Sequence, residues 1–236
     1  MADARHEDWG LPSYWLPRPG TTRTDGLDAA LRRITDAHVL NGTGAWLPTP
    51  LPCPAWVFLT WLGEEMGLML RGSGHPAIEA FTPRAPDDRS PDQFSKQRAV
   101  FATTDGIWAI FYAILDRDAG SFGFLNAALR FGDGKGRWSP MRYYFSLSHS
   151  APAAPWRPGV VYILPPGGFR RQPPGRIGER SALEPHFARQ APVRPLAKLH
   201  VRPDDFPFLD RVARHDRERV DRRSVEAPYS FPWRES

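Results

Sequence analysis

A strand that leads directly into a helix lies near the middle of the chain, in the stretch RAVFATTDGIWAIFYAILDR, residues 98–117. Residues 98–104 are rich in apolar and β-branched side chains, which is typical of a strand. A strongly apolar helix follows at once, and either Thr104 or Asp105 is able to cap its first turn. We therefore predict a buried strand joined without a loop to a buried helix.

An arginine stands at the end of an earlier apolar strand, in the stretch LMLRGSG, residues 68–74. The guanidinium of Arg71 suits a phosphate or carboxylate, which it can bind through two hydrogen bonds. Gly72 and Gly74 let a ligand approach the backbone, and Ser73 adds a hydroxyl and a backbone donor. The alternative is a structural ion pair with a neighbouring acid: Glu64, Glu65 or an acid of the following loop.

The junction between the second strand and its helix is a second candidate site. The hydroxyls of Thr103 and Thr104, with the free amides of a helix N-terminus, can bind an anion or a polar ligand. Trp108 and Tyr112 stand four positions apart on one helical face, where they are able to stack on a flat ring. The alternative is that the threonines cap the helix and the aromatic side chains fill the core. For the aromatic residues we favour the core.

The remaining patterns indicate an α+β protein, because helices come first and strands dominate the middle. No linker is evident, so we predict a single domain. It comprises an irregular arm over 1–24, a helical part over 25–67, a mixed sheet region over 68–203 and a C-terminal helix over 204–223. Within these parts, helices are expected over 24–40 and 55–67, and strands over 141–149, 159–166 and 192–201, with a shorter element over 124–132.

The positive charge is concentrated in one segment. Residues 130–200 hold 12 basic and 3 acidic residues, whereas residues 1–129 hold 11 basic and 15 acidic ones. Residues 167–181 form a basic loop, GGFRRQPPGRIGERS, that suits a flap. The segment 130–200 is either a solvated basic face or a groove for nucleic acid or another phosphate-bearing ligand.

Composition argues against several classes of protein. No apolar run approaches the roughly 18–20 residues of a membrane helix, and the first ten residues carry no apolar signal-peptide core. The single cysteine, Cys53, allows no intrachain disulfide. We expect a cytoplasmic protein without a membrane partner. We also expect no metal, because His75 and His149 lack partners at suitable spacing and the loop acids Asp87, Asp88 and Asp92 show no converging ligands.

The order LRGSG, then FTPR, then AVFATTDGIWAIFYAI resembles the ADP-ribosyltransferase-like group. A closer resemblance, over most of the chain, is to an uncharacterised bacterial family with the same run. The ADP-ribosyltransferase resemblance implies a split, mostly antiparallel sheet flanked by N-terminal helices. It also implies NAD as the cofactor and transfer of ADP-ribose to a nucleic-acid, protein or small-molecule acceptor.

The same resemblance implies roles for individual residues. Arg71 would grip NAD, and a late acid would orient the nucleophile. Glu184 is our choice for that acid, with Glu179 and Gln190 as alternatives. The other residues that would line the NAD site are Gly72, Ser73, Gly74, Arg84, Thr103, Thr104, Trp108 and Tyr112. The competing hypothesis is a non-enzymatic protein that binds nucleic acid or a partner through the basic 130–200 surface.

Overall fold

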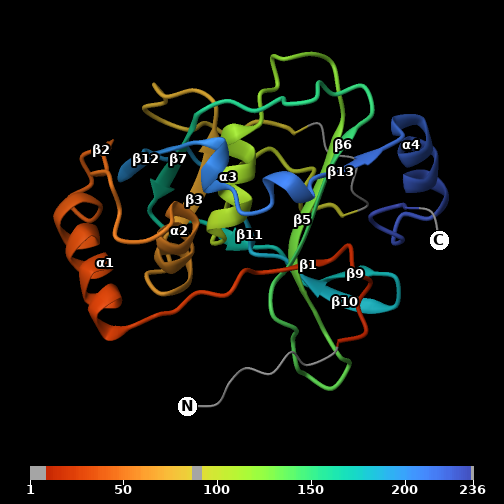
Figure 1. Ribbon diagram of the computed structural model, residues 1–236, viewed down its shortest axis with the longest axis horizontal. Helices are drawn as coiled ribbons and strands as arrows, with labels where there is room; N and C mark the ends of the chain where they lie inside the picture. Colours follow the sequence, from red (N-terminus) through yellow and green to blue (C-terminus); the bar gives the residue numbers. More distant parts are fainter. Residues whose placement is uncertain (1–8, 87–91, 235–236) are drawn as a thin grey trace.

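A helix between two sheets organises the computed structural model, which describes residues 9–86 and 92–234 (Figure 1). The helix is α3, Gly106–Ile114, and all of its residues except Tyr112 are buried. Asp105 caps it, because its side chain accepts a hydrogen bond from the backbone N–H of Trp108 at 2.8 Å. The expected passage from strand to helix without a loop is confirmed. Only two residues separate the end of strand β4, Val100–Thr103, from the start of α3.

The larger sheet has seven strands in the order β2-β12-β7-β3-β4-β11-β8. All of its pairings are antiparallel except the parallel pair β2 and β12. Besides β4, its strands are β2 (Ala45–Trp46), β3 (Met69–Ser73), β7 (Gly159–Leu164), β8 (Arg170–Arg171), β11 (His186–Arg189) and β12 (Ala197–Val201).

The second sheet has six strands in the order β1-β6-β5-β10-β9, with β13 also paired to β6. Within the described part of this sheet, all pairings are antiparallel except the parallel pair β6 and β13. Its strands are β1 (Leu16–Pro17), β5 (Phe124–Phe131), β6 (Arg142–Ser148), β9 (Gly175–Ile177), β10 (Arg180–Leu183) and β13 (Ala213–His215). The predicted α+β class with mostly antiparallel sheets is therefore confirmed.

The main core lies between the sheets and joins them into one domain. It contains Leu70 and Val161 from the larger sheet, Tyr143 and Phe145 from the second sheet, and the apolar side chains of α3. Helices α1 (Asp25–His38) and α2 (Ala55–Glu64) pack at the side of the larger sheet (Figure 1). A smaller core covers the opposite face of the larger sheet.

Two glycines allow α3 to lie directly on the larger sheet. A Cβ atom added at Gly72 would stand 2.0 Å from the carbonyl oxygen of Ala109, and one at Gly159 would stand 2.0 Å from that of Ala113. Both distances are far below van der Waals contact, so any side chain there would push the helix away. On that face of the strand, the helix thus occupies the space that a side chain at position 72 would need.

The larger sheet opens between β3 and β4. These strands share a single paired position, Leu70 with Thr103. Beyond it, residues 71–73 pair only with β7, and residues 100–102 pair only with β11. Two neighbouring strands therefore diverge at the point where Arg71 stands.

The predicted C-terminal helix over 204–223 is wrong for most of its length. Two short 3-10 turns, Pro203–Asp205 and Leu209–Arg211, are followed by β13, and only α4, Arg217–Glu226, is helical. Pro207 explains the break, because a residue before proline is disfavoured in helical geometry. Phe206 accordingly has extended backbone angles, and its side chain is buried in the main core.

Other differences concern short strands. The segment 167–181, expected as a loop, contains β8 and β9 and the start of β10, and the arm over 1–24 contributes β1. The strand expected over 192–201 is confirmed only from Ala197. These strands have two to five residues, too few for an alternating pattern to stand out.

Candidate functional site

The side chain of Arg71 spans the opening between β3 and β4. Its Nη1 donates to the backbone carbonyl of Phe101 on β4, and its guanidinium carbon lies 5.1 Å from the ring centroid of Phe81. The residue is partly buried. Within residues 9–86 and 92–234, no carboxylate forms an ion pair with Arg71. Of the acids named in the expected alternative, Glu64 and Glu65 pair instead with Arg18 and Arg23, and Asp87 and Asp88 of the following loop lie outside the described residues.

The surroundings of Arg71 are cationic. The pKa of Arg71 is lowered to about 10, mainly by burial and also by the positive charges of Arg117 and Arg84, while Tyr112 acts in the opposite direction. The guanidinium of Arg117 lies 5.4 Å from the ring centroid of Tyr112. At neutral pH Arg71 still carries its full charge. A partly buried cation with cationic neighbours and, among the described residues, no carboxylate partner favours binding of an anion.

A cluster of rings lies beside Arg71. We call Phe94, Phe101, Trp108 and His186 the aromatic cluster. His186 stacks on Phe101 with centroids 5.1 Å apart and an interplanar angle of 27°. The rings of Phe94 and Trp108 each meet His186 edge-on at 5.6 Å. Three of these rings are only partly buried, whereas Trp108 is buried. Aromatic faces at such a position suit a flat ring.

His186 comes from β11, where it pairs with Thr103 of β4. Its Nδ1 lies 2.7 Å from Oε1 of the buried Gln172. Burial lowers the pKa of His186 to about 4, the charge of Asp92 raises it, and that of Arg71 lowers it. The imidazole is therefore neutral at pH 7. Sequence reasoning missed His186 and Gln172, because only the long-range pairing of β11 with β4 brings them to this place.

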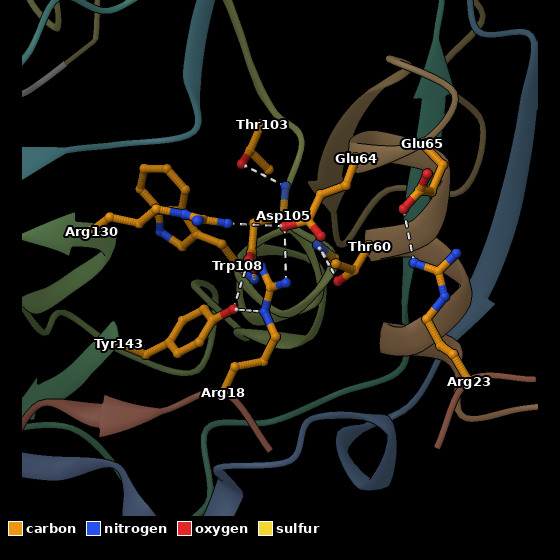
Figure 2. A network of polar contacts seen from close by, with 11 residues as sticks. Arg18, Arg23, Thr60, Glu64, Glu65, Thr103, Asp105, Trp108, Arg130 and Tyr143 are labelled. Atoms are coloured by element: carbon orange, nitrogen blue, oxygen red, sulfur yellow. Dashed lines mark hydrogen bonds and ion pairs between the residues drawn. The ribbon is translucent and has the colours of Figure 1, made fainter. Parts of the chain in front are cut away.

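A buried polar network fixes the helix that carries Trp108 (Figure 2). Oδ2 of Asp105 accepts hydrogen bonds from Arg18 at 2.8 Å and from the hydroxyl of Tyr143 at 2.7 Å. Arg18 also forms an ion pair with Glu64 at 2.9 Å. Because Arg18 belongs to the N-terminal arm and Tyr143 to β6, Asp105 ties the start of α3 to the second sheet.

Hydroxyl groups complete this network from the other side. Thr103 Oγ1 accepts from the backbone N–H of Asp105 at 3.0 Å, and Thr60 Oγ1 accepts from that of Gly106 at 3.2 Å (Figure 2). A further hydrogen bond holds the side chain of Trp108, whose indole N–H donates to Oδ1 of Asn126 at 2.5 Å. Thr103 thus supports the helix start, but Asp105 caps the helix rather than either of the two threonines considered in the sequence.

The other residues predicted to bind the cofactor lie at varying positions. The charge of Arg84 lowers the pKa of Arg71, whereas Tyr112 raises it. The Ser73 hydroxyl accepts a hydrogen bond from the backbone N–H of His75 at 3.1 Å. Gly74 lies against the guanidinium of Arg157. The backbone N–H of Thr104 donates to the carbonyl of Pro185 at 3.3 Å.

The three residues considered for orienting the nucleophile, Glu184, Glu179 and Gln190, lie in different parts of the fold. Glu184 is partly buried in the connection between β10 and β11, two positions before His186. Glu179 lies in the turn between β9 and β10, where it lines a cavity of about 700 Å³ with Arg137 and Arg180. Gln190 donates to Oε1 of Gln97 at 3.2 Å. Of these, Glu184 lies closest along the chain to the aromatic cluster.

The structure offers little for metal chemistry. Among the described residues, no group of three or more His, Cys, Asp or Glu side chains is arranged to hold a metal ion. Asp87 and Asp88, two of the loop acids considered in the sequence, lie outside the described residues.

Comparisons of the chain with protein-family models, with curated proteins and with solved structures found no match in any of the three. No helix within the described ranges has both the length and the apolar character needed to cross a membrane.

Proposed function

We propose that the chain is an ADP-ribosyltransferase-like protein that binds NAD at the opening between β3 and β4. The observation that carries this proposal is Arg71, a cation without a carboxylate partner among the described residues and with Arg117 and Arg84 as cationic neighbours. A diphosphate would neutralise this charge and accept two parallel hydrogen bonds from the guanidinium. The sequence resemblance around LRGSG and AVFATTDGIWAIFYAI supports the same assignment.

The aromatic cluster supports a dinucleotide rather than an inorganic anion. Its rings lie near the cation, and the charge of Arg71 lowers the pKa of His186. A ligand that carries both phosphates and flat rings would use both features at once. Tyr112, on the same helix as Trp108 and only partly buried, adds a further ring. The single cysteine fits a reducing compartment, so we place the proposed activity in the cytoplasm.

Glu184 is our proposed catalytic carboxylate. In this kind of transfer the bond between C1′ of the ribose and the nicotinamide nitrogen breaks, and nicotinamide leaves with the electron pair. A new bond forms between C1′ and an acceptor oxygen, which loses its proton. Glu184 would stabilise the cationic ribose and receive that proton. Its position just before β11 brings the carboxylate into the connection that leads to His186.

Calorimetric titration with NAD tests the binding step. We expect the wild type to bind and Arg71→Ala to bind at least about tenfold more weakly, because charge-assisted hydrogen bonds to phosphate are lost. Arg142→Ala is the matched control. Arg142 is also partly buried and donates to a backbone carbonyl, that of Met141 at 3.3 Å, but it stands on β6 of the other sheet. Equal NAD affinity in all three proteins, or none in the wild type, would refute the assignment.

The second candidate function is binding of nucleic acid by the basic 130–200 surface. Arg170 and Arg171 form the exposed edge strand β8, and Arg194 is also exposed. None of the three has an ion-pair partner in the described part of the chain. Charged side chains on an edge strand also discourage pairing with other chains. Affinity for single-stranded RNA that falls steeply with salt and does not respond to NAD would favour this function.

A further inference from the structure

Gln172 fixes the tautomer of His186. The backbone N–H of Gln172 donates to the carbonyl of His186 at 2.8 Å, so the two residues lie opposite each other at the end of β8 and β11. The side-chain oxygen of Gln172, which can only accept, faces Nδ1 at 2.7 Å. Nδ1 therefore carries the hydrogen, and the other ring nitrogen, Nε2, carries a lone pair.

The lone pair on Nε2 is not used by the part of the chain that the structure describes. Within residues 9–86 and 92–234, no hydrogen bond engages this atom. Nor is it sealed from solvent, since the buried side-chain atoms without a partner in the same ranges belong to other residues: Trp9, Trp61, Arg157 and Arg189. An oriented acceptor thus meets solvent among the rings of the aromatic cluster.

We propose that His186 reads a hydrogen-bond donor on the flat ring of the ligand, by accepting an N–H at Nε2. This inference rests on the proposed NAD site and adds to it a residue that determines specificity. The shared chemistry is an N–H group on an aromatic ring system, which NAD offers twice: in the carboxamide of nicotinamide and in the amino group of adenine. A ligand without that donor would leave Nε2 desolvated and unpaired, which costs affinity.

The surroundings keep His186 in the accepting form. The rings of Phe94, Phe101 and Trp108 pack against the imidazole, whose burial disfavours its protonation, and the nearby charge of Arg71 has the same effect. Asp92 opposes these effects, but the pKa of His186 still lies at about 4. An acceptor at neutral pH beside a guanidinium donor gives the site two opposite hydrogen-bonding groups. A nucleotide would have to match both.

Two NAD analogues separate the two sources of the donor. The 3-acetylpyridine analogue replaces the carboxamide by a methyl ketone, and the purine analogue replaces the adenine amino group by a hydrogen atom, so each lacks one of the two N–H donors. We expect the wild type to bind one of them roughly 10- to 100-fold more weakly than NAD. In His186→Phe, which keeps an aromatic ring but has no acceptor, that ratio should fall towards one. In His186→Gln, whose amide oxygen can replace Nε2, part of the ratio should return.

The outcomes distinguish this inference from the function on which it rests. A ratio that collapses for the acetylpyridine analogue assigns His186 to the carboxamide, and one that collapses for the purine analogue assigns it to adenine. Equal ratios in the wild type and His186→Phe, with NAD still bound, overturn the role of His186 alone. Failure of the wild type to bind NAD overturns both. Thermal melting of each variant shows that the comparison is made on folded protein.

Discussion

The imidazole of His186 makes a measurable contribution to stability at the scale of a single residue. Its pKa of about 4 in the folded chain lies below the usual value of about 6.5. The unfolded chain therefore binds a proton first as the pH falls. The stabilisation is complete above pH 6.5 and is lost as the pH falls to about 4. His215, also partly buried, has a pKa lowered to about 4 mainly by burial and should add to the trend.

Replacing His186 should flatten this dependence. Between pH 6.5 and 4.5 the free energy of unfolding of the wild type should fall, and His186 alone contributes up to about 1.4 kcal/mol per pH unit. His186→Gln lacks the titrating group, so the difference between the two proteins should shrink as the pH falls. Urea unfolding at several pH values measures it. A difference that stays constant with pH would show that His186 does not titrate between the two states.

At the scale of an element, the position of α3 depends on how closely it approaches β3. Buried residues lie on every side of the helix, so it has no face that is turned to solvent. It is held by contact with α2, the larger sheet and the second sheet together. A displacement of the helix would move Trp108 relative to His186 and the other rings of the aromatic cluster. The geometry of the site is therefore coupled to packing on its far side.

Gly72→Ala should disturb this contact. The added Cβ would stand 2.0 Å from the carbonyl oxygen of Ala109, so either strand or helix must shift. We expect a loss of about 1–3 kcal/mol, the usual cost of overpacking, or more. Gly175→Ala is the matched control, since Gly175 also lies in a strand but has open space around its α-carbon. Chemical denaturation of both variants checks this, and equal stabilities would contradict it.

Local patterns predicted elements better than they predicted pairing. Apolar periodicity was sufficient for α1, α2, α3 and the long strands, because each has a strong pattern of its own. Arg71 and Trp108 could be singled out because they lie in such elements, β3 and α3. His186 could not, because β11 has only four residues, and its neighbours come from β4 and β8. A site assembled from distant short strands leaves no spacing signal in the sequence.

On the scale of the whole molecule, Asp105 joins parts that are far apart in the chain. Its carboxylate is 1% exposed and receives hydrogen bonds from the N-terminal arm, from β6 and from α3. Loss of this group would leave Arg18 and Tyr143 with one partner fewer in a place that water does not reach easily. The arm, both sheets and the helix should therefore unfold as one cooperative unit.

Asp105→Ala should cost about 3–5 kcal/mol, because it breaks a buried pair and removes a helix cap. Thr24→Ala, which removes the cap of α1 at an exposed position, should cost only about 1 kcal/mol. Urea unfolding followed by two probes, tryptophan fluorescence and circular dichroism, measures both values. A small loss in Asp105→Ala, or two separate transitions in the wild type, would argue against the joining role.

The opening between β3 and β4 also has a consequence for backbone hydrogen exchange. The carbonyl of Phe101 points into the opening, where Arg71 donates to it. In an extended strand the N–H of the same residue points to the same side. The Phe101 amide therefore faces a gap in the ladder, in the middle of a sheet whose neighbouring amides are paired with β11. Its deuterium uptake should be fast for so central a position, and a ligand seated in the gap should slow it.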